Sequence, residues 1–253
     1  MRNPYSAPGV LGSTLRWYYL LMAVAAMAML SGALLYWMVA DHDIWLAWLC
    51  AIDRRAMLLL NFDGGAVADH FFYGYSQKTT WLPLAVVTIA YTFGWRRGTW
   101  RESLALALII VAMFAFTDQI TSGVIKPLVA RPRPSHDAVL APMLHYVYGY
   151  HGGHFGFVSG HAANMCCLAV FLGYVYRSKA MRAVLCLFAA LMCYSRIYLG
   201  VHYPGDIVCG ALVGMGVARL VVAVCPARLL PRYERTPWGV IVVWTITTLL
   251  LLA

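Results

Sequence analysis

Three short segments of this otherwise apolar chain carry residues suited to phosphate chemistry. Fixed cations beside backbone N–H donors form a site for a multiply charged anion, most naturally a phosphoryl group. Two histidines next to such a site add reactivity, because a neutral imidazole can attack phosphorus and a protonated one can donate to the leaving oxygen. The residues are Lys126, Arg131 and Arg133 in the first segment, Ser159, Gly160 and His161 in the second, and Arg196, His202 and Asp206 in the third.

Two local patterns predict how these residues are held. Ser159 and Gly160 precede a long apolar run, so their backbone N–H groups and the positive end of a helix dipole would face an anion. Asp206 follows His202 by four residues, and its carboxylate can accept the other ring N–H of that histidine and fix its tautomer. Pro204 predicts a helix that starts between the two, with Asp206 in its first turn.

The composition predicts a polytopic membrane protein. Of the 253 residues, 62% are hydrophobic and 11% are charged, and the mean hydropathy is +0.70. A soluble domain would carry about 25% charged residues. The net charge of +9 does not indicate nucleic-acid binding, because the basic residues form short clusters at 96–101, 177–182 and 228–235, as in cytoplasmic loops. The seven cysteines show no metal-type spacing, and we interpret them as small buried hydrophobic residues.

Apolar runs predict an all-α bundle of six core membrane spans, and we treat residues 1–253 as one integral membrane domain. The run at 44–60 is interrupted by three charged residues at 53–55, so we predict a short interfacial helix there instead of a span. The last run, 238–253, fits either a seventh span or a helix on the membrane surface. The six spans are about 17–40, 79–95, 103–125, 159–176, 183–198 and 206–224.

The topology brings the three reactive segments together. With the N-terminus inside, the ends of the third and fifth spans and the starts of the fourth and sixth all lie outside. We therefore expect the three segments to meet at one membrane face and to form one site. Gly210 and Gly214 form a GxxxG pattern in the sixth span, which favours close packing against a neighbouring helix.

The three segments also resemble a known family. The patterns are K-x6-RP at Lys126, Arg133 and Pro134, SGH at Ser159–His161, and SR-x5-H-x3-D at Ser195, Arg196, His202 and Asp206. In order and spacing they resemble the three signature motifs of the type 2 phosphatidic acid phosphatase superfamily, which also contains bacterial acid phosphatases and vanadium haloperoxidases. One departure is Val158, since many members have proline before SGH.

The resemblance implies a role for each motif residue. His202 would be the nucleophile that forms a phosphohistidine, and Asp206 would orient it. His161 would protonate the leaving group and then activate water. No metal or other cofactor is implied, because the cations supply the charge that metals provide elsewhere. The implied phosphate-binding residues are Lys126, Arg133, Ser159, Gly160 and Arg196.

Several residues outside the motif positions keep more than one interpretation. Asp118 lies eight residues before Lys126 on roughly the same helical face, with Ser122, so it either supports Lys126 or is a hydrogen-bonded packing residue. Arg131 either contacts lipid headgroups or a second phosphate, or supports the residues that bind the phosphate. For the loop histidines we favour a solvated or substrate-facing loop over a metal site, and three nearby tyrosines suit an interfacial aromatic belt. These residues are His136, His145, His151 and His154, and Tyr146, Tyr148 and Tyr150.

The resemblance implies a membrane phosphatase of a lipid phosphate or diphosphate, with its site at the periplasmic face of the bacterial inner membrane. Its partners would be the lipid substrate and membrane lipids. We favour undecaprenyl diphosphate or lipid A, with phosphatidylglycerol phosphate as an alternative. Another hypothesis is a phosphotransferase that passes the phosphoryl group from His202 to a second lipid, and a more distant one is a non-catalytic lipid-binding protein or transporter. The oligomeric state stays open.

Overall fold

The computed structural model describes residues 43–94, 100–226, 229–230 and 232–253. Their regular structure is helical, and they form no strand, only isolated bridges between Pro132 and Phe155 and between Tyr176 and Tyr233. The all-α class is therefore confirmed for these residues. The α-helices are α2 (Asp43–Leu60), α3 (Gly65–Ser76), α4 (Leu82–Gly94), α5 (Trp100–Asp118), α6 (Lys126–Val129), α7 (Gly160–Val175), α8 (Lys179–Tyr198), α9 (Pro204–Val224) and α10 (Trp238–Leu250).

Among the described residues, three helical segments are long and apolar enough to cross a membrane: Ser103–Val129, Lys179–Tyr198 and Pro204–Val224. The predicted first span, 17–40, lies outside the described residues. The helices α4 and α7 fall at two other predicted spans, and α10 falls at the run that fits a seventh span or a surface helix, but all three are shorter. The helix α7, at 16 residues, is about 24 Å long against a hydrocarbon core of about 30 Å. The chain is a multi-pass membrane protein, and three of the predicted spans that fall on described residues have the full length for a crossing.

The third predicted span runs further than expected. Trp100–Asp118 continues through a π-helical segment, Gln119–Ile125, into Lys126–Val129. Pro127 has no N–H to donate to the preceding turn, and the wider π turn lies just before it, which is a usual way to absorb such a break. The helix ends at Ala130, whose φ of 47° is left-handed. Lys126 is therefore in the last turns of a helix and not in the following loop.

The close approach of α7 and α9 places the start of α7. A side chain at Gly210 would put its Cβ 2.5 Å from the carbonyl oxygen of Ser159, and one at Gly214 would clash with the carbonyl of Ala163. The predicted GxxxG contact is thus present, and its partner is the helix that begins with the SGH motif. Further along the two helices, Phe171, Val175, Val217 and Ala218 belong to one buried apolar cluster.

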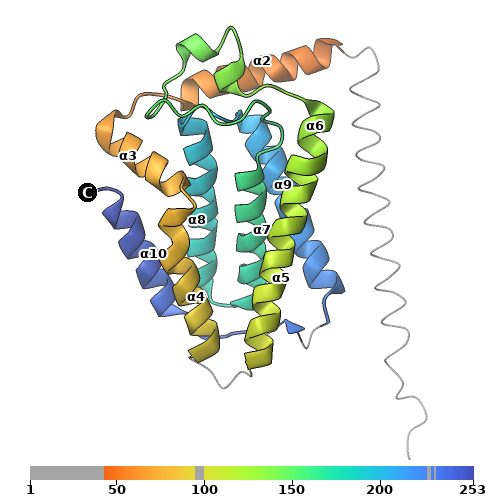
Figure 1. Ribbon diagram of the computed structural model, residues 1–253, viewed down its shortest axis with the longest axis vertical. Coiled ribbons are helices and arrows are strands. Elements are labelled where there is room, and N and C mark those ends of the chain that lie inside the picture. Colours follow the sequence, from red (N-terminus) through yellow and green to blue (C-terminus); the bar gives the residue numbers. More distant parts are fainter. Residues whose placement is uncertain (1–42, 95–99, 227–228, 231) are drawn as a thin grey trace, which may run out of the picture.

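One end of the bundle is covered by α2, which crosses it instead of running along the other helices (Figure 1). On α2 itself, the side chain of Met57 is fully buried, whereas those of Trp48 and Leu59 are exposed. This arrangement agrees with the predicted interfacial helix. The same end holds the end of α6 and the starts of α7 and α9 (Figure 1). A short helix that the sequence analysis did not predict, α3, follows α2 there.

Candidate active site

The three reactive segments meet around Asp206. The Nδ1 atom of His202 lies 3.5 Å from Oδ2 of Asp206. The backbone N–H of Ser159 donates to the carbonyl oxygen of Asp206 at 3.0 Å, and Nη1 of Arg131 donates to Oδ1 of Asp206 at 2.9 Å. The convergence that the topology predicted is therefore present at one end of the bundle.

The pair of His202 and Asp206 is held at the start of α9. This helix begins at Pro204, as predicted, and the N–H of Tyr203 donates to Oδ2 of Asp206 at 3.1 Å. His202 and Asp206 are both almost fully buried. Burial lowers the pKa of His202 well below its ordinary value, and the positive charges of Arg133, Arg196 and Lys126 lower it further. The imidazole is therefore neutral at neutral pH.

Two buried arginines flank this histidine. Arg133 is 8% exposed and Arg196 is 3% exposed. Nε of Arg133 donates to the carbonyl oxygen of Phe155 at 3.1 Å. Arg196 donates through Nη2 to the Tyr150 hydroxyl at 3.1 Å and through Nη1 to the Ser76 hydroxyl. Burial and then the charge of Arg196 lower the pKa of Arg133, so the two cations destabilise one another.

These arginines keep donors that the described residues do not satisfy. Nη1 of Arg133 and Nε of Arg196 are buried without a hydrogen-bond partner among the residues that the structure describes. Buried polar atoms are nearly always paired, and a buried charge without a counter-ion is costly. Two such donors from two cations beside His202 fit an anion with several oxygens.

Ser159 caps the helix that faces this site. Its Oγ accepts from the N–H of Ala162 at 3.4 Å, and its own N–H is used by Asp206. Helix geometry leaves the N–H groups of Gly160 and His161 without an intrahelical acceptor. The predicted anion-binding helix start is therefore displaced by one residue, from Ser159 and Gly160 to Gly160 and His161. Val158, at the position where many family members have proline, is buried and anchors the entry to α7.

His161 is half-buried in the first turn of α7. The cations that act on its ring are Arg196, Lys78 and Lys126. Two of them, Arg196 and Lys126, also act on His202, so the two predicted histidines lie near the same cations. Lys78, which precedes the 3-10 turn Thr79–Trp81, is a cation that the motifs did not indicate.

Lys126 and Asp118 are connected along the helix, as their spacing predicted. Nζ of Lys126 lies 3.5 Å from the Ser122 hydroxyl. That hydroxyl lies 3.4 Å from Oδ1 of Asp118. A Cβ built on Gly160 would be 3.8 Å from both Oδ1 of Asp118 and Oγ of Ser122, so this helical face borders the start of α7. Of the two interpretations of Asp118, this geometry favours the one in which Asp118 supports Lys126.

Arg131 does not face lipid headgroups. Its Nη1 atom donates to Asp206, and its Nη2 donates to Oδ2 of Asp53 on α2 at 2.7 Å. Its guanidinium lies 4.0 Å from the ring centroid of Tyr203. Contact with a headgroup or a second phosphate does not agree with this structure, because two carboxylates already occupy both ends of the guanidinium. The alternative, that Arg131 supports the site residues, agrees with these contacts.

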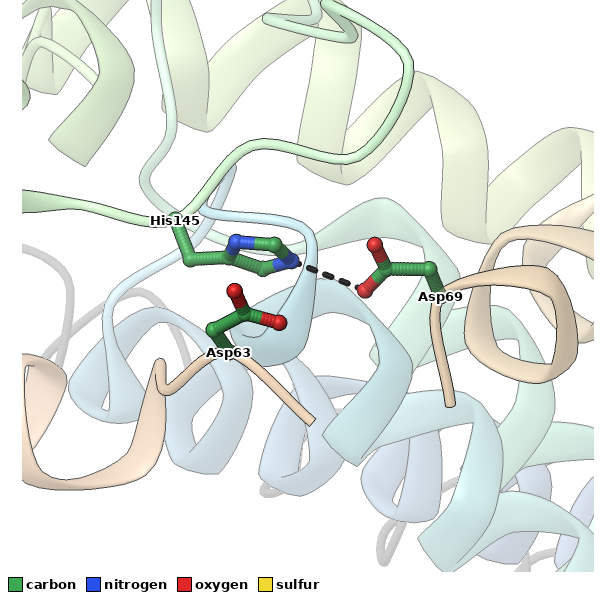
Figure 2. A group of neighbouring side chains, drawn as sticks. All are labelled: Asp63, Asp69 and His145. Atoms are coloured by element: carbon green, nitrogen blue, oxygen red, sulfur yellow. Dashed lines mark hydrogen bonds and ion pairs between the residues drawn. The ribbon is translucent and has the colours of Figure 1, made fainter. Parts of the chain in front are cut away.

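Among the loop histidines, His145 lies apart from the phosphate site. Its Nε2 atom is 2.8 Å from Oδ1 of Asp69, and Asp63 lies beside them (Figure 2). The three side chains offer ligand-type atoms within 4.8 Å of one another. Oδ1 of Asp69 also accepts from the Tyr198 hydroxyl at 2.6 Å. The group is therefore a hydrogen-bonded network that ties α3 and the loop to the end of α8.

The other loop histidines lie nearer the phosphate site. The rings of His136 and His154 are 5.1 Å apart, centroid to centroid, and His136, His151 and His154 are all exposed. Burial, His154 and Arg133 together lower the pKa of His136. This agrees with a solvated or substrate-facing loop.

Sequence reasoning missed the residues that hold the cations. Tyr150 was predicted to lie in an aromatic belt, but its hydroxyl bonds to Arg196. Ser76 and Asp53 lie 120 and 78 residues from the arginines that they contact. The position of Tyr150, in a loop next to the motifs, could have indicated a contact with the site. Nothing in the sequence indicated the contacts of Ser76 and Asp53.

Comparisons with known proteins agree with this geometry. The sequence model of the PAP2 superfamily matches residues 102–230, just over half of the chain. A protein of Porphyromonas gingivalis named lipid A 4'-phosphatase is 35% identical over 191 residues, which are 76% of this chain and 78% of that protein. A Bacteroides thetaiotaomicron protein of the same name is 35% identical over 167 residues, 66% of this chain and 73% of that one.

The fold has a solved counterpart. The crystal structure of a transmembrane PAP2-type phosphatidylglycerolphosphate phosphatase from Bacillus subtilis matches with a TM-score of 0.54 at 21% identity, covering 83% of this chain and 94% of that one. At this identity the likeness shows the fold alone. The family match and the relatives together establish that the chain belongs to the PAP2 superfamily and is a phosphoric monoester hydrolase.

Proposed function

We propose that this chain hydrolyses a lipid phosphate through a phosphohistidine on His202. The observation that supports the proposal most strongly is the pair of unsatisfied donors on Arg133 and Arg196 beside a buried, neutral imidazole. A phosphoryl group offers the oxygens that these donors lack. Lys126 and the N–H groups at the start of α7 would hold the remaining oxygens as charge develops in the transition state.

In the proposed reaction, the second ring nitrogen of His202, Nε2, attacks phosphorus, because Nδ1 faces Asp206. The P–N bond forms as the bond from phosphorus to the lipid oxygen breaks. His161, which takes up a proton once the phosphoryl oxygens neutralise the cations around it, donates that proton to the lipid oxygen. Neutral His161 then takes a proton from water, which attacks phosphorus, breaks the P–N bond and releases phosphate. Asp206 stabilises the positive ring of His202 during the first step.

For the substrate we propose the phosphate monoester of lipid A. The support is that the two relatives at 35% identity are both named lipid A 4'-phosphatase. An open, polar loop with three exposed histidines beside Arg133 suits a bulky sugar headgroup. Undecaprenyl diphosphate is less favoured on this ground, and phosphatidylglycerol phosphate corresponds to the name of a relative at 31% identity.

The test is phosphate release by the purified protein in detergent. Lipid A, undecaprenyl diphosphate and phosphatidylglycerol phosphate are compared at equal micelle concentration, with and without EDTA. We expect the highest kcat/KM for lipid A and no detectable release by His202→Ala. Unchanged activity in His202→Ala would disprove the mechanism, and a higher kcat/KM for another lipid would disprove the substrate. Labelled phosphate that appears on an added acceptor lipid, instead of in solution, would identify a phosphotransferase.

We also propose that the site faces the periplasm. The basic residues at the other end of the bundle, Arg101, Arg177, Lys179, Arg182 and Arg232, match the positive-inside rule. Two arginines at the site end differ, since Arg54 on α2 and Arg131 in the adjoining loop are paired with carboxylates. Single cysteines placed at Val139 and Lys179 in a cysteine-free variant provide the test. A membrane-impermeant maleimide applied to intact spheroplasts should label the first and spare the second, and the reverse pattern would place the site in the cytoplasm.

A further inference from the structure

The surface helix α2 reaches into the turn that carries His202 and Asp206. Asp53 accepts the backbone N–H of Gly205 through Oδ1 at 2.7 Å and Nη2 of Arg131 through Oδ2 at 2.7 Å. A Cβ built on Gly205 would lie 2.8 Å from Oδ2 of Asp53, so the carboxylate approaches the start of α9 as closely as a glycine allows. Asp53 is only 13% exposed.

Arg131 connects this carboxylate to Asp206. Nη2 of its guanidinium donates to Asp53, and Nη1 donates to Oδ1 of Asp206 at 2.9 Å. The planar group also lies over the ring of Tyr203. A guanidinium fixed at both Nη atoms and on one face has little freedom to rotate. Asp53 supplies one of the three contacts that set its position.

The orientation of Asp206 depends on that position. Its Oδ1 atom accepts from Arg131, while Oδ2 accepts from the N–H of Tyr203 at 3.1 Å and faces Nδ1 of His202. If Arg131 shifts, the carboxylate loses the contact that keeps Oδ1 away from the histidine and Oδ2 towards it.

We propose that Asp53, on the membrane-surface helix, is a positioning residue for the reaction: it fixes Arg131, which in turn fixes the Asp206 carboxylate against His202. This inference rests on the proposed role of His202 as nucleophile. It assigns α2 a part in the chemistry although its sequence lies outside the three motifs and outside the matched family region.

The next residue on α2 supplies a matched control. Arg54 donates to Oδ2 of Asp137 through Nε at 3.1 Å and through Nη2 at 2.8 Å. Oδ2 of Asp137 also accepts from the Tyr203 hydroxyl at 2.9 Å. This second ion pair docks α2 on the same turn, but it makes no contact with Asp206. Loss of Arg54 therefore reports on docking alone.

The experiment compares Asp53→Asn, Arg131→Lys and Arg54→Gln with the unmodified protein. Each is purified as a monodisperse species by size-exclusion chromatography, and kcat and KM are measured per folded enzyme on one lipid phosphate. We expect Asp53→Asn to lower kcat at least about tenfold, as misplacement of a group by about 1 Å does, with KM within about twofold. Arg131→Lys should do the same, because an ammonium cannot bridge two carboxylates as the guanidinium does. Arg54→Gln should keep kcat within about twofold.

Further variants separate the possible outcomes. Asp53→Glu, which keeps the carboxylate, should recover part of kcat, and it also serves if Asp53→Asn does not fold. An unchanged kcat in Asp53→Asn, or an equal loss in Arg54→Gln, would overturn the inference, because the helix would then only be docked. His202→Ala is measured alongside. If that variant is inactive while Asp53→Asn is normal, only this inference fails; if it is active, the proposed function itself fails.

Discussion

Two sets of arginines lie at the same end of the bundle and differ in what neutralises them. Arg54 and Arg131 are each bound to carboxylates, at distances of 2.7 to 2.9 Å. Arg133 and Arg196 are more deeply buried, and the hydrogen-bond acceptors that they contact among the described residues are neutral: a carbonyl oxygen and two hydroxyls.

The difference separates cations that hold the structure from cations that hold a substrate. A buried ion pair satisfies its own charges and is costly to break, whereas a buried cation without a counter-ion is costly to keep. Arg133 and Arg196 are therefore expected to lower the stability of the free protein and to be neutralised by the phosphoryl group. The four predictions below test this division, from the largest expected effect to the smallest.

The largest effect is expected from Arg133→Met. This change removes a cation and an unsatisfied donor from the site, so kcat/KM for the lipid phosphate should fall about 10²- to 10³-fold, as when one donor to a developing charge is lost. The melting temperature in detergent should stay the same or rise, because a buried like-charge repulsion with Arg196 is removed.

The control for Arg133→Met is Arg55→Met, which removes an exposed arginine at the same end of the protein. It should leave kcat/KM unchanged. A clear drop in melting temperature for Arg133→Met would mean that Arg133 stabilises the structure as Arg54 and Arg131 do. It would contradict the proposed difference between the two sets of arginines.

Arg131→Met should lower the stability of the protein, whereas Arg133→Met should leave it unchanged or raise it. It leaves Asp53 and the fully buried Asp206 without their shared cation, which costs about 3 kcal/mol or more. The melting temperature in detergent should fall markedly. Arg54→Met is the control. Arg54 is half exposed, and the buried Asp137 keeps the Tyr203 hydroxyl and two backbone N–H donors, so this change should cost only about 1 kcal/mol. Equal melting temperatures in these two variants would contradict the assignment.

The sequence predicted this site better than its supports. Spacing and apolar periodicity placed Lys126, Ser159 and His202 at helix ends on one face, because membrane crossings of fixed length leave few alternative topologies. The motif residues could be found because their chemical types recur in a fixed order. The start of α9 at Pro204 followed from proline geometry alone.

The supports could not be predicted because their partners are distant and ordinary in type. Asp53 was noticed only as a charge that interrupts an apolar run, and Ser76 gave no pattern at all. Their contacts depend on how α2 and α3 fold back over the bundle, and a short helix such as α3, with Asp69 and His70 inside it, has no periodicity strong enough to fix that path. The role of Arg131 stayed open for the same reason, since neither carboxylate beside it is near in sequence.

The cations that lack a counter-ion also predict how kcat/KM depends on pH. Burial, and then Arg133, Arg196 and Lys126, hold the pKa of His202 below its ordinary 6.5, and the neutral ring is the proposed nucleophile. The wild-type kcat/KM should therefore stay constant as pH falls from 7 through 6.5 and decline only below. In Arg133→Met, His202 loses one positive neighbour, so its pKa rises towards 6.5. The decline of kcat/KM at low pH should therefore begin at a higher pH than in the wild type.

Both proteins are measured on the same substrate, so that the ionisation of the phosphate itself cancels in the difference between the two profiles. An acidic limb in the same place for both would mean that the charge of Arg133 does not reach His202. A wild-type limb at or above pH 6.5 would contradict the neutral, buried imidazole.

The smallest effect is expected from Tyr150→Phe. The Tyr150 hydroxyl accepts one N–H of Arg196, and the loss of one such bond costs about 1 kcal/mol, or about fivefold in kcat/KM. Tyr148→Phe, which changes an exposed ring two residues away, is the matched control and should have no effect. If Tyr150→Phe also has none, the Ser76 hydroxyl is enough to hold Arg196, and Tyr150 belongs with the other tyrosines of the loop. A fivefold loss would show that a substrate-binding cation is held in place by neutral groups, which orient the guanidinium without satisfying the charge that the phosphoryl group must neutralise.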